Sequence, residues 1–180
     1  MRFAAGHLFR EKINIIVFVI LILASLLFFY NLGGYSLVDF DEAWYGEIAR
    51  NILVNHNPFL LYFNGKPYTD HPPLGFILMA ISQLVFRTSE FAVRLPSAVC
   101  GFGSLVLTFL IGRKLFTSTV GVGAMLVLVS SVWFILRSRE GNLDTILLFF
   151  YLLTIFLILK IKEGHIWLRA FSASFAFLLI

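Results

Sequence analysis

A series of long apolar runs, with few charged residues inside them, constrains this chain more than any other feature. The runs cover residues 13–30, 95–112, 118–136, 143–159 and 166–180. A helix of about 20 apolar residues crosses the hydrocarbon core of a bilayer, where a helix satisfies its own backbone hydrogen bonds. The runs therefore predict an all-α polytopic membrane protein with these five segments as its spans.

The composition supports this class and argues against nucleic acid as a partner. Apolar residues make up 59% of the chain and charged residues only 13%, against about 25% charged in ordinary globular domains. The net charge is +4, but the basic residues are scattered and form no binding stripe. The sequence also lacks a P-loop and a dinucleotide-binding fingerprint, which disfavours a sugar-nucleotide donor.

Both ends of the sequence bear on its topology. Arg2, Arg10 and Lys12 precede the first apolar run, which is longer than a typical secretory signal and has no small-residue cleavage site after it. We interpret this run as an uncleaved signal anchor. The sequence stops inside an apolar run, so we expect residues 1–180 to be the N-terminal part of a longer transmembrane domain.

A sixth apolar run, residues 74–86, is too short to span a bilayer comfortably. If it does not cross, most basic residues outside the spans fall on one side, as the positive-inside rule requires of the cytoplasmic face. That side holds Arg2, Arg10, Lys12, Arg113, Lys114, Lys160, Lys162 and Arg169. Residues 31–94 then form one long external loop, and the N-terminus is cytoplasmic in a cell membrane.

The external loop is expected to hold two helices that lie flat on the membrane. Apolar residues recur at helical spacing over residues 41–54, opposite a polar face. Residues 62–68 contain an Asn-Gly pair and predict an extended turn. Pro72 and Pro73 then open the short apolar run, since proline is tolerated in the first turn of a helix.

The candidate catalytic residues are Asp41 and Glu42, which follow the first span. Carboxylates at a membrane face are costly to keep near lipid and usually serve chemistry or ion handling. Asp41 is placed to act as a general base. The alternative is that both residues are first-turn acids that complement the dipole of their helix.

Three further polar groups are expected on the same face. Asp70 and His71 precede the two prolines, either as a phosphate-binding pair or as a helix cap beside a surface histidine. Arg94 either binds a lipid phosphate or anchors its span by snorkelling. Arg137, Arg139, Glu140 and Asp144 form a loop between two spans, which either binds an anion or is paired internally.

These residues carry a family resemblance. Asp-Glu-Ala-Trp-Tyr-Gly-Glu-Ile-Ala-Arg (41–50), His-Pro-Pro-Leu (71–74) and Ser-Glu-Phe-Ala-Val-Arg-Leu-Pro-Ser-Ala (89–98) resemble GT-C membrane glycosyltransferases. More narrowly, they resemble the bacterial protein O-mannosyltransferase and aminoarabinose transferase group. The resemblance extends through Gly112-Arg113-Lys114-Leu115-Phe116 and Arg139 to Leu143-Asp144.

The resemblance implies a GT-C-like helix bundle with two juxtamembrane helices in the first external loop. It also implies transfer of a hexosyl or pentosyl group from a polyprenyl-phosphate donor to an extracytoplasmic lipid, glycan or protein of the cell envelope. It implies catalysis by Asp41, with Glu42 beside it. Donor phosphate would be held by His71, where the aminoarabinose branch has lysine, and by Arg94, Arg137 and Arg139.

The resemblance leaves a cofactor open. In some branches the counterpart of Asp144 helps to hold a divalent metal, and in the mannosyltransferase branch no metal is required. A metal at Asp144, with Asp70, is one expectation, and metal-free catalysis is the other. The alternative function is a non-catalytic membrane protein that binds or flips a polyprenyl lipid.

Overall fold

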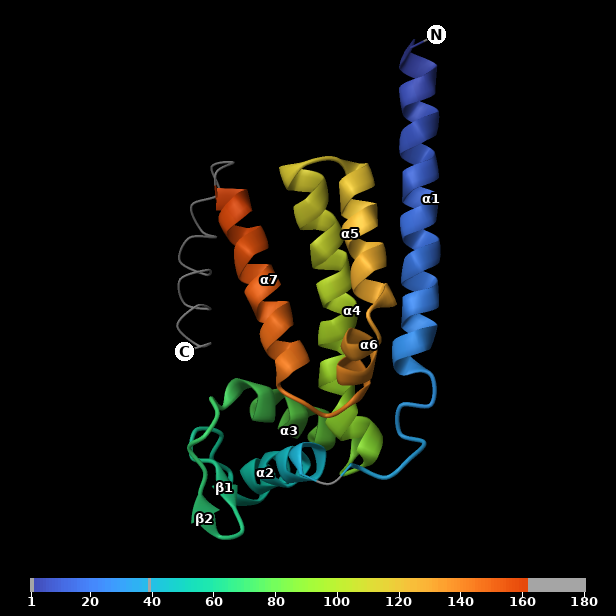
Figure 1. Cartoon of the computed structure of the whole chain (residues 1–180). Helices are drawn as coiled ribbons and strands as arrows, with labels where there is room; N and C mark the ends of the chain where they lie inside the picture. The colour runs from blue at the N-terminus through green and yellow to red at the C-terminus, as the bar shows by residue number, and fades with distance from the viewer. Residues whose placement is uncertain (1, 39, 162–180) are drawn as a thin grey trace.

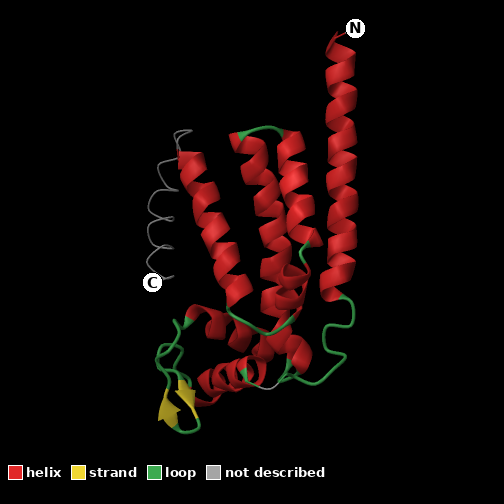
Figure 2. Ribbon diagram, viewed as in Figure 1, coloured by secondary structure: helices red, strands yellow, loops and turns green. Residues whose placement is uncertain are grey.

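The computed structural model describes residues 2–38 and 40–161, so the predicted span 166–180 lies outside the described residues. Seven helices and one hairpin make up the described part: α1 (Arg2–Phe29), α2 (Asp41–Asn55), β1 (Tyr62–Phe63), β2 (Lys66–Pro67), α3 (Leu74–Phe86), α4 (Glu90–Leu115), α5 (Ser118–Ser130), α6 (Val132–Arg139) and α7 (Asp144–Ile161). The predicted all-α class is thus confirmed, with the short hairpin as an addition (Figure 2).

The helices form a bundle and a cross layer. Helices α1, α4, α5 and α7 run side by side, while α2, α3 and the hairpin lie across one end of the bundle (Figure 1). The prediction that residues 74–86 do not cross with the other helices is therefore confirmed. The helix predicted over residues 41–54 is also confirmed, since α2 covers Asp41–Asn55.

Two helices of the described residues are each long and apolar enough to cross a bilayer, namely Glu11–Phe29 and Glu90–Leu115. Helices α5 and α6 add a third span if they count as one bent unit. The predicted span 118–136 is not one straight helix, because the chain bends by 69° at this break. Ser131 is extended there, and its hydroxyl caps α6 by accepting from the N–H of Phe134 at 3.4 Å. Serine competes in this way with helix continuation.

Two apolar cores fix this arrangement. One joins α1 to α4, α5 and α6 around Phe28, Leu105 and Met125. The other joins α2 and α3 to α4 and α7 around Ile48, Phe76 and Ile146. The second core buries the apolar face predicted for α2, so the first turn of that helix is held against the loop between α6 and α7.

The hairpin follows from its turn residues. Tyr62 pairs with Pro67 and Phe63 with Lys66. The two residues between the strands, Asn64 and Gly65, both have positive φ angles, at 50° and 73°. Asn-Gly tolerates such angles and matches the twist of a two-residue hairpin. The hairpin places Tyr68 and His71 at the edge of the cross layer.

Candidate active site

Asp41 opens α2 at the junction between the bundle and the cross layer. Its side chain is 58% exposed, and one carboxylate oxygen lies 4.0 Å from an Nη of Arg137. As the first residue of the helix, it lies near unsatisfied backbone N–H groups. The Asp41 carboxylate is therefore accessible at the start of α2, as a general base requires.

Glu42, the next residue, is enclosed instead. Its side chain is 3% exposed, and its two oxygens accept four hydrogen bonds. Two come from Arg94, at 2.7 and 2.9 Å, and two from the backbone N–H groups of Val38 and Gly141, both at 2.8 Å. The carboxylate thus joins α2 to α4, to the linker after α1 and to the loop before α7.

Arg94 completes this enclosed pair. The side chain is fully buried, and beyond its two bonds to Glu42 it donates to the carbonyls of Leu32, Tyr35 and Ser36 at 2.8 to 3.0 Å. The guanidinium also stacks 3.8 Å from the centroid of the Tyr35 ring. All five N–H donors of the arginine are used.

Two sequence-based assignments are corrected by this geometry. Arg94 has no donor left for a lipid phosphate, and Glu42 has no accessible oxygen for an acceptor substrate. The pair instead holds the backbone on both sides of Asp41, because each partner is bonded to segments far apart in the sequence.

The protonation of Glu42 follows from its partners. Burial by itself would raise the pKa of this carboxyl, but the hydrogen bonds from Arg94 and from the backbone N–H groups of Val38 and Gly141 outweigh it. The pKa of Glu42 is therefore lowered from its ordinary value. Glu42 is a buried anion matched by a buried cation, the only way in which such charges are tolerated.

Arg137 is the centre of a more open cluster. It lies at the end of α6, 26% exposed, and its Nη atoms lie 3.0 Å from Glu140 and 3.2 Å from Asp144 as well as 4.0 Å from Asp41. Asp144 is 70% exposed. One cation here faces three carboxylates from α2, the loop and α7. The predicted loop pairing is thus present, although it runs through Arg137 rather than Arg139.

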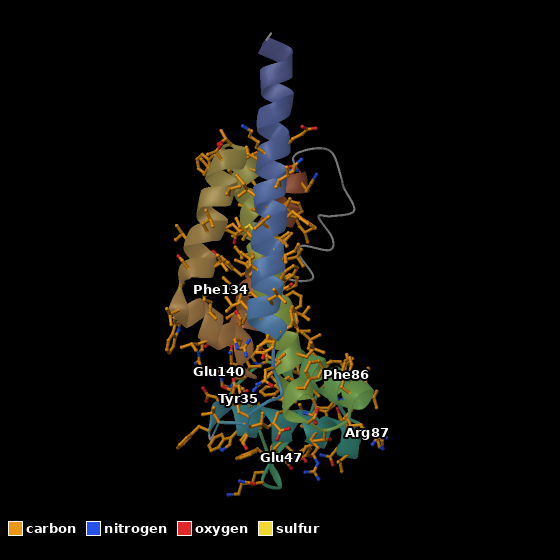
Figure 3. The ribbon with its side chains drawn as sticks, turned by 90° about the vertical axis from the view of Figure 1, so that its right-hand side faces the viewer. Tyr35, Glu47, Phe86, Arg87, Phe134 and Glu140 are labelled. Atoms are coloured by element: carbon orange, nitrogen blue, oxygen red, sulfur yellow. The ribbon has the colours of Figure 1, made fainter. Side chains whose placement is uncertain are left out.

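A pocket of about 310 Å³ opens at this cluster. It is lined by Val38, Phe40, Asp41, Glu42, Arg137, Glu140, Gly141 and Asn142. Figure 3 shows Tyr35 and Glu140 where the bundle meets the cross layer, which is the level of this pocket. The pocket is polar, and its accessible charged groups come from α2, from the end of α6 and from the loop that follows α6.

An apolar groove of about 170 Å³ has Asp144 on its wall, beside the cluster. It is lined by His71, Pro72, Leu74, Gly75, Leu143, Asp144, Ile146, Leu147 and Phe150. The groove lies between the start of α3 and the first turns of α7. Its polar residues, His71 and Asp144, stand among aliphatic and aromatic side chains.

His71, a sequence-predicted residue, lines this groove from the segment just before α3. Its Nδ1 lies 2.7 Å from the hydroxyl of Tyr68, and its ring stacks on that tyrosine with centroids 6.0 Å apart. Burial, with the charge of Asp41 second, raises the pKa of Tyr45 to about 12, so this neighbouring phenol stays neutral. The remaining predicted residue of the segment, Asp70, is exposed.

Arg139 is not in the cluster. Its guanidinium donates to the carbonyls of Leu27 and Tyr30, the latter at 2.9 Å, at the end of α1. Cations at a helix C-terminus bind its free carbonyls and complement its dipole. The prediction that Arg139 binds donor phosphate is thus not supported, because the side chain is used to hold α1 against α6.

Sequence reasoning missed the residues that shape the loop between α6 and α7. The side chain of Asn142 donates to the carbonyls of Arg137 and Glu140, and its oxygen caps α7 by accepting from the N–H of Thr145 at 3.1 Å. Ser97 donates to the carbonyl of Asn142 at 2.9 Å. The Gly-Asn pair before an acidic helix start was the available signal, since asparagine is a preferred N-cap.

Comparisons with known proteins give the family of this chain. The model of the dolichyl-phosphate-mannose-protein mannosyltransferase family matches residues 70–179. A polyprenol-phosphate-mannose–protein mannosyltransferase of Mycobacterium tuberculosis is 33% identical over 156 residues, which are 81% of this chain and 28% of that protein. An undecaprenyl phosphate-alpha-4-amino-4-deoxy-L-arabinose arabinosyl transferase of Shewanella sediminis is 35% identical over 128 residues, which are 68% of this chain and 23% of that protein.

The fold has relatives among solved structures. ArnT from Cupriavidus metallidurans, solved in the apo state and bound to undecaprenyl phosphate, matches with a TM-score of 0.73. The identity is 21%, and the match covers 79% of this chain and about a quarter of that chain. This likeness confirms the predicted GT-C-like fold.

The match covers only part of each relative. The chain spans about a quarter to a third of the length of the curated relatives that it matches. The family model, however, covers more than half of this chain, including His71, Arg137 and Asp144. The chain therefore belongs to the dolichyl-phosphate-mannose-protein mannosyltransferase family.

Proposed function

We propose that this chain carries the reaction centre of a glycosyltransferase that moves a sugar from a polyprenyl-phosphate donor to an extracytoplasmic acceptor. Family membership supports glycosyl transfer. The names of the relatives support the donor class, since they specify polyprenol phosphate and undecaprenyl phosphate. The sugar is a hexose or a pentose, and the acceptor is a lipid, a glycan or a protein of the cell envelope.

The open carboxylate of Asp41 is the observation that carries this proposal. It stands at a polar pocket, while the carboxylate next to it is fully bonded. A structural acid would be expected to resemble Glu42, with its oxygens satisfied and enclosed. Asp41 is left accessible at the end of a rigid helix, as a general base must be.

The apolar groove supports an amphiphilic donor. A polyprenyl phosphate has an anionic head and a hydrocarbon tail, and it needs basic groups beside an apolar surface. Two basic groups lie near Asp144. His71 lines the groove together with Asp144, and Arg137 is paired with Asp144. Leu147 and Phe150 continue the groove along α7. In this proposal the phosphate lies between His71 and Arg137. The first part of the hydrocarbon tail lies along α7.

The reaction follows from this placement. Asp41 takes the proton from the acceptor hydroxyl or amine, whose lone pair attacks the anomeric carbon of the donor sugar. The bond from that carbon to the phosphate oxygen breaks, and its electron pair leaves with the polyprenyl phosphate. Arg137 and His71 stabilise the charge that develops on the phosphate, and this effect is strong in a low-dielectric site. Attack opposite the leaving group inverts the anomeric centre.

A divalent metal does not fit the described residues well. They contain no group of three or more His, Cys, Asp or Glu side chains placed to hold one ion. Asp144 is paired with Arg137, and Asp70 is exposed and does not line the groove. The metal expected at Asp144 and Asp70 therefore lacks a donor set here, and every step above uses protein groups alone.

The proposed orientation places this site outside the cytoplasm. Arg113 and Lys114 lie in the last turn of α4, at the end that points away from the cross layer, and Lys12 lies in the N-terminal half of α1, which points the same way (Figure 1). Basic residues of this kind favour the cytoplasmic face. The cross layer, with Asp41 and the groove, is then on the extracytoplasmic side, where lipid-linked donors serve envelope acceptors.

Transfer of label from radiolabelled polyprenyl-phosphate sugars, in membranes that carry the full chain, tests this function. We expect Asp41→Asn to lower turnover by about 10²- to 10⁴-fold, the usual contribution of a general base. Glu47→Gln is the matched control, because it removes a carboxylate from the same helix, where Glu47 pairs with Arg50 outside the pocket. Figure 3 shows Glu47 in the cross layer below the bundle.

The outcomes separate the proposal from its rival. Near wild-type turnover of Asp41→Asn would remove the general base from the mechanism. Donor that binds to both proteins and is consumed by neither would favour a protein that binds or flips polyprenyl lipids. Turnover lost in Asp41→Asn and retained in Glu47→Gln supports the transferase.

A further inference from the structure

The ring of His71 is held by an aromatic neighbour that the mechanism above does not use. The Tyr68 hydroxyl lies 2.7 Å from Nδ1 of His71, and the two rings are nearly parallel, with planes 8° apart. Tyr45 meets the same imidazole edge to face, with centroids 5.7 Å apart. An exposed histidine is thus fixed on one face by stacking and at one nitrogen by a hydrogen bond.

Tyr68 is itself fixed in place. Its backbone N–H donates to the carbonyl of Leu61 at 2.9 Å, just outside the strands of the hairpin. Its ring packs against Phe76 of the buried core, with centroids 5.8 Å apart and planes at 83°. The hydroxyl therefore points at Nδ1 from a rigid support, so it can determine which nitrogen of His71 carries the proton.

The direction of this hydrogen bond follows from the chemistry of the two groups. Burial, and then the charges of Asp70 and Asp41, raise the pKa of Tyr68, so the phenol keeps its proton. In a neutral imidazole, the nitrogen without a proton is a better acceptor than a phenol oxygen, which favours the Tyr68 O–H as the donor to Nδ1. The ring proton is then on Nε2, because the partner of one nitrogen sets the state of the other.

We propose that Tyr68 is a positioning residue that keeps Nε2–H of His71 available as a hydrogen-bond donor to the phosphate of the lipid donor. This inference rests on the proposed function. His71 lines the groove with Asp144, and Nδ1 is occupied, so Nε2 is the ring nitrogen left for a ligand. Without the phenol, the imidazole can also take the tautomer in which Nε2 lacks a proton and repels the phosphate.

A double-mutant cycle tests this role, because a lysine ammonium has no tautomers and needs no partner to remain a donor. The measured quantity is the Kd of undecaprenyl phosphate for the full chain in nanodiscs. We expect Tyr68→Phe to raise it about two- to fivefold, because only part of the His71 population then presents Nε2–H to the phosphate. In a His71→Lys background, the same substitution should leave the Kd unchanged. Tyr62→Phe is the control, since this hairpin tyrosine does not line the groove.

A second readout separates positioning from folding. The ¹⁵N spectrum of labelled histidine, with the His71 signals identified by their loss in His71→Lys, should show a protonated Nε2 in the wild type. Tyr68→Phe should move these signals toward a mixture of tautomers. Equal weakening of binding in both backgrounds, or an unchanged Kd in Tyr68→Phe, would overturn the role of Tyr68.

Failure of the proposed function looks different in the same experiment. A wild-type chain that does not bind undecaprenyl phosphate would overturn both the function and this assignment, even if the spectrum showed the expected tautomer. A wild-type chain that binds the lipid, with no response to Tyr68→Phe, would overturn the assignment alone.

Discussion

Two arginines meet carboxylates on either side of the start of α2, and they differ in how much of their capacity is used. Arg94 is fully enclosed, and each of its five donors is bonded. Arg137 is a quarter exposed, and it faces three carboxylates at distances between 3.0 and 4.0 Å. The contacts of Arg94 hold the backbone in place. Arg137 remains a partly exposed cation beside a pocket.

The contrast extends to the two neighbouring acids. Glu42 turns inward to Arg94, and Asp41 turns to the pocket and Arg137. Adjacent residues of a helix point about 100° apart, so one acidic pair can serve both directions. A saturated ion pair therefore indicates a structural role, and an unsaturated one beside a cavity indicates a functional role.

Removal of the enclosed cation should give the largest effect. We expect Arg94→Ala to destabilise the chain by about 3–5 kcal/mol, because the charge of Glu42 is left buried without a partner. Arg50→Ala is the control, since Arg50 and Glu47 form an exposed pair at 3.2 Å worth about 0–1 kcal/mol. Thermal unfolding in detergent measures both. Equal melting temperatures for the two variants would show that the buried pair contributes no more to stability than the exposed pair.

A smaller loss is expected where the enclosed pair meets the loop before α7. In Gly141→Ala the new Cβ would lie 2.5 Å from Val93 and 3.2 Å from Glu42, so the loop must shift, at a cost of about 1–3 kcal/mol. Gly123→Ala adds a Cβ with no atom within 4 Å and should be neutral or stabilising by up to about 1 kcal/mol. The same unfolding assay compares them, and a Gly141→Ala chain as stable as wild type would show that the loop is not held tightly.

The open arginine should affect binding and leave stability unchanged. Arg137→Lys keeps the charge but removes the planar fork that reaches several oxygens at once. We expect the KM for the donor to rise about tenfold, the loss of one hydrogen bond between charged groups. The melting temperature should not change. A fall in melting temperature like that of Arg94→Ala would place both arginines in the same structural class.

The smallest effect is a pH dependence of stability. The pKa of Glu42 is lowered below its ordinary value of 4.5, so its contribution to stability is present above the unfolded pKa and is lost as the pH falls through the folded one. In Glu42→Gln this dependence should be absent. The difference in melting temperature between the two chains should therefore narrow below about pH 4.5. A difference that stays constant there would contradict the lowered pKa.

Most of the helical architecture could be predicted from the sequence. Long apolar runs, the period of α2 and the sorting of basic residues are local or additive signals, and they gave the cross layer correctly. The break at Ser131 could not be predicted with them, because hydropathy averages over a window and a single capping hydroxyl does not change the average.

The site was harder to predict, because its roles depend on distant partners. Asp41 and Glu42 are adjacent acids with the same local sequence pattern. Their roles are distinguished by the contact of Glu42 with Arg94, 52 residues later in the chain. Arg139 and Arg137 are likewise two residues apart, yet one binds the end of α1 and the other the acidic cluster. The sequence predicted that these residues share one face of the protein. The role of each residue could be assigned only from its tertiary contacts.

The bonds of Glu42 have a consequence for biosynthesis. Its carboxylate leaves the ribosome 52 residues before Arg94 and 99 residues before Gly141, the two groups that enclose it together with the linker. Until they arrive, the acid must stay hydrated at the translocon exit, since it cannot enter lipid alone. Asp41 is consequently positioned only after α4, α5 and α6 have been inserted, so the order of synthesis delays the completion of its surroundings.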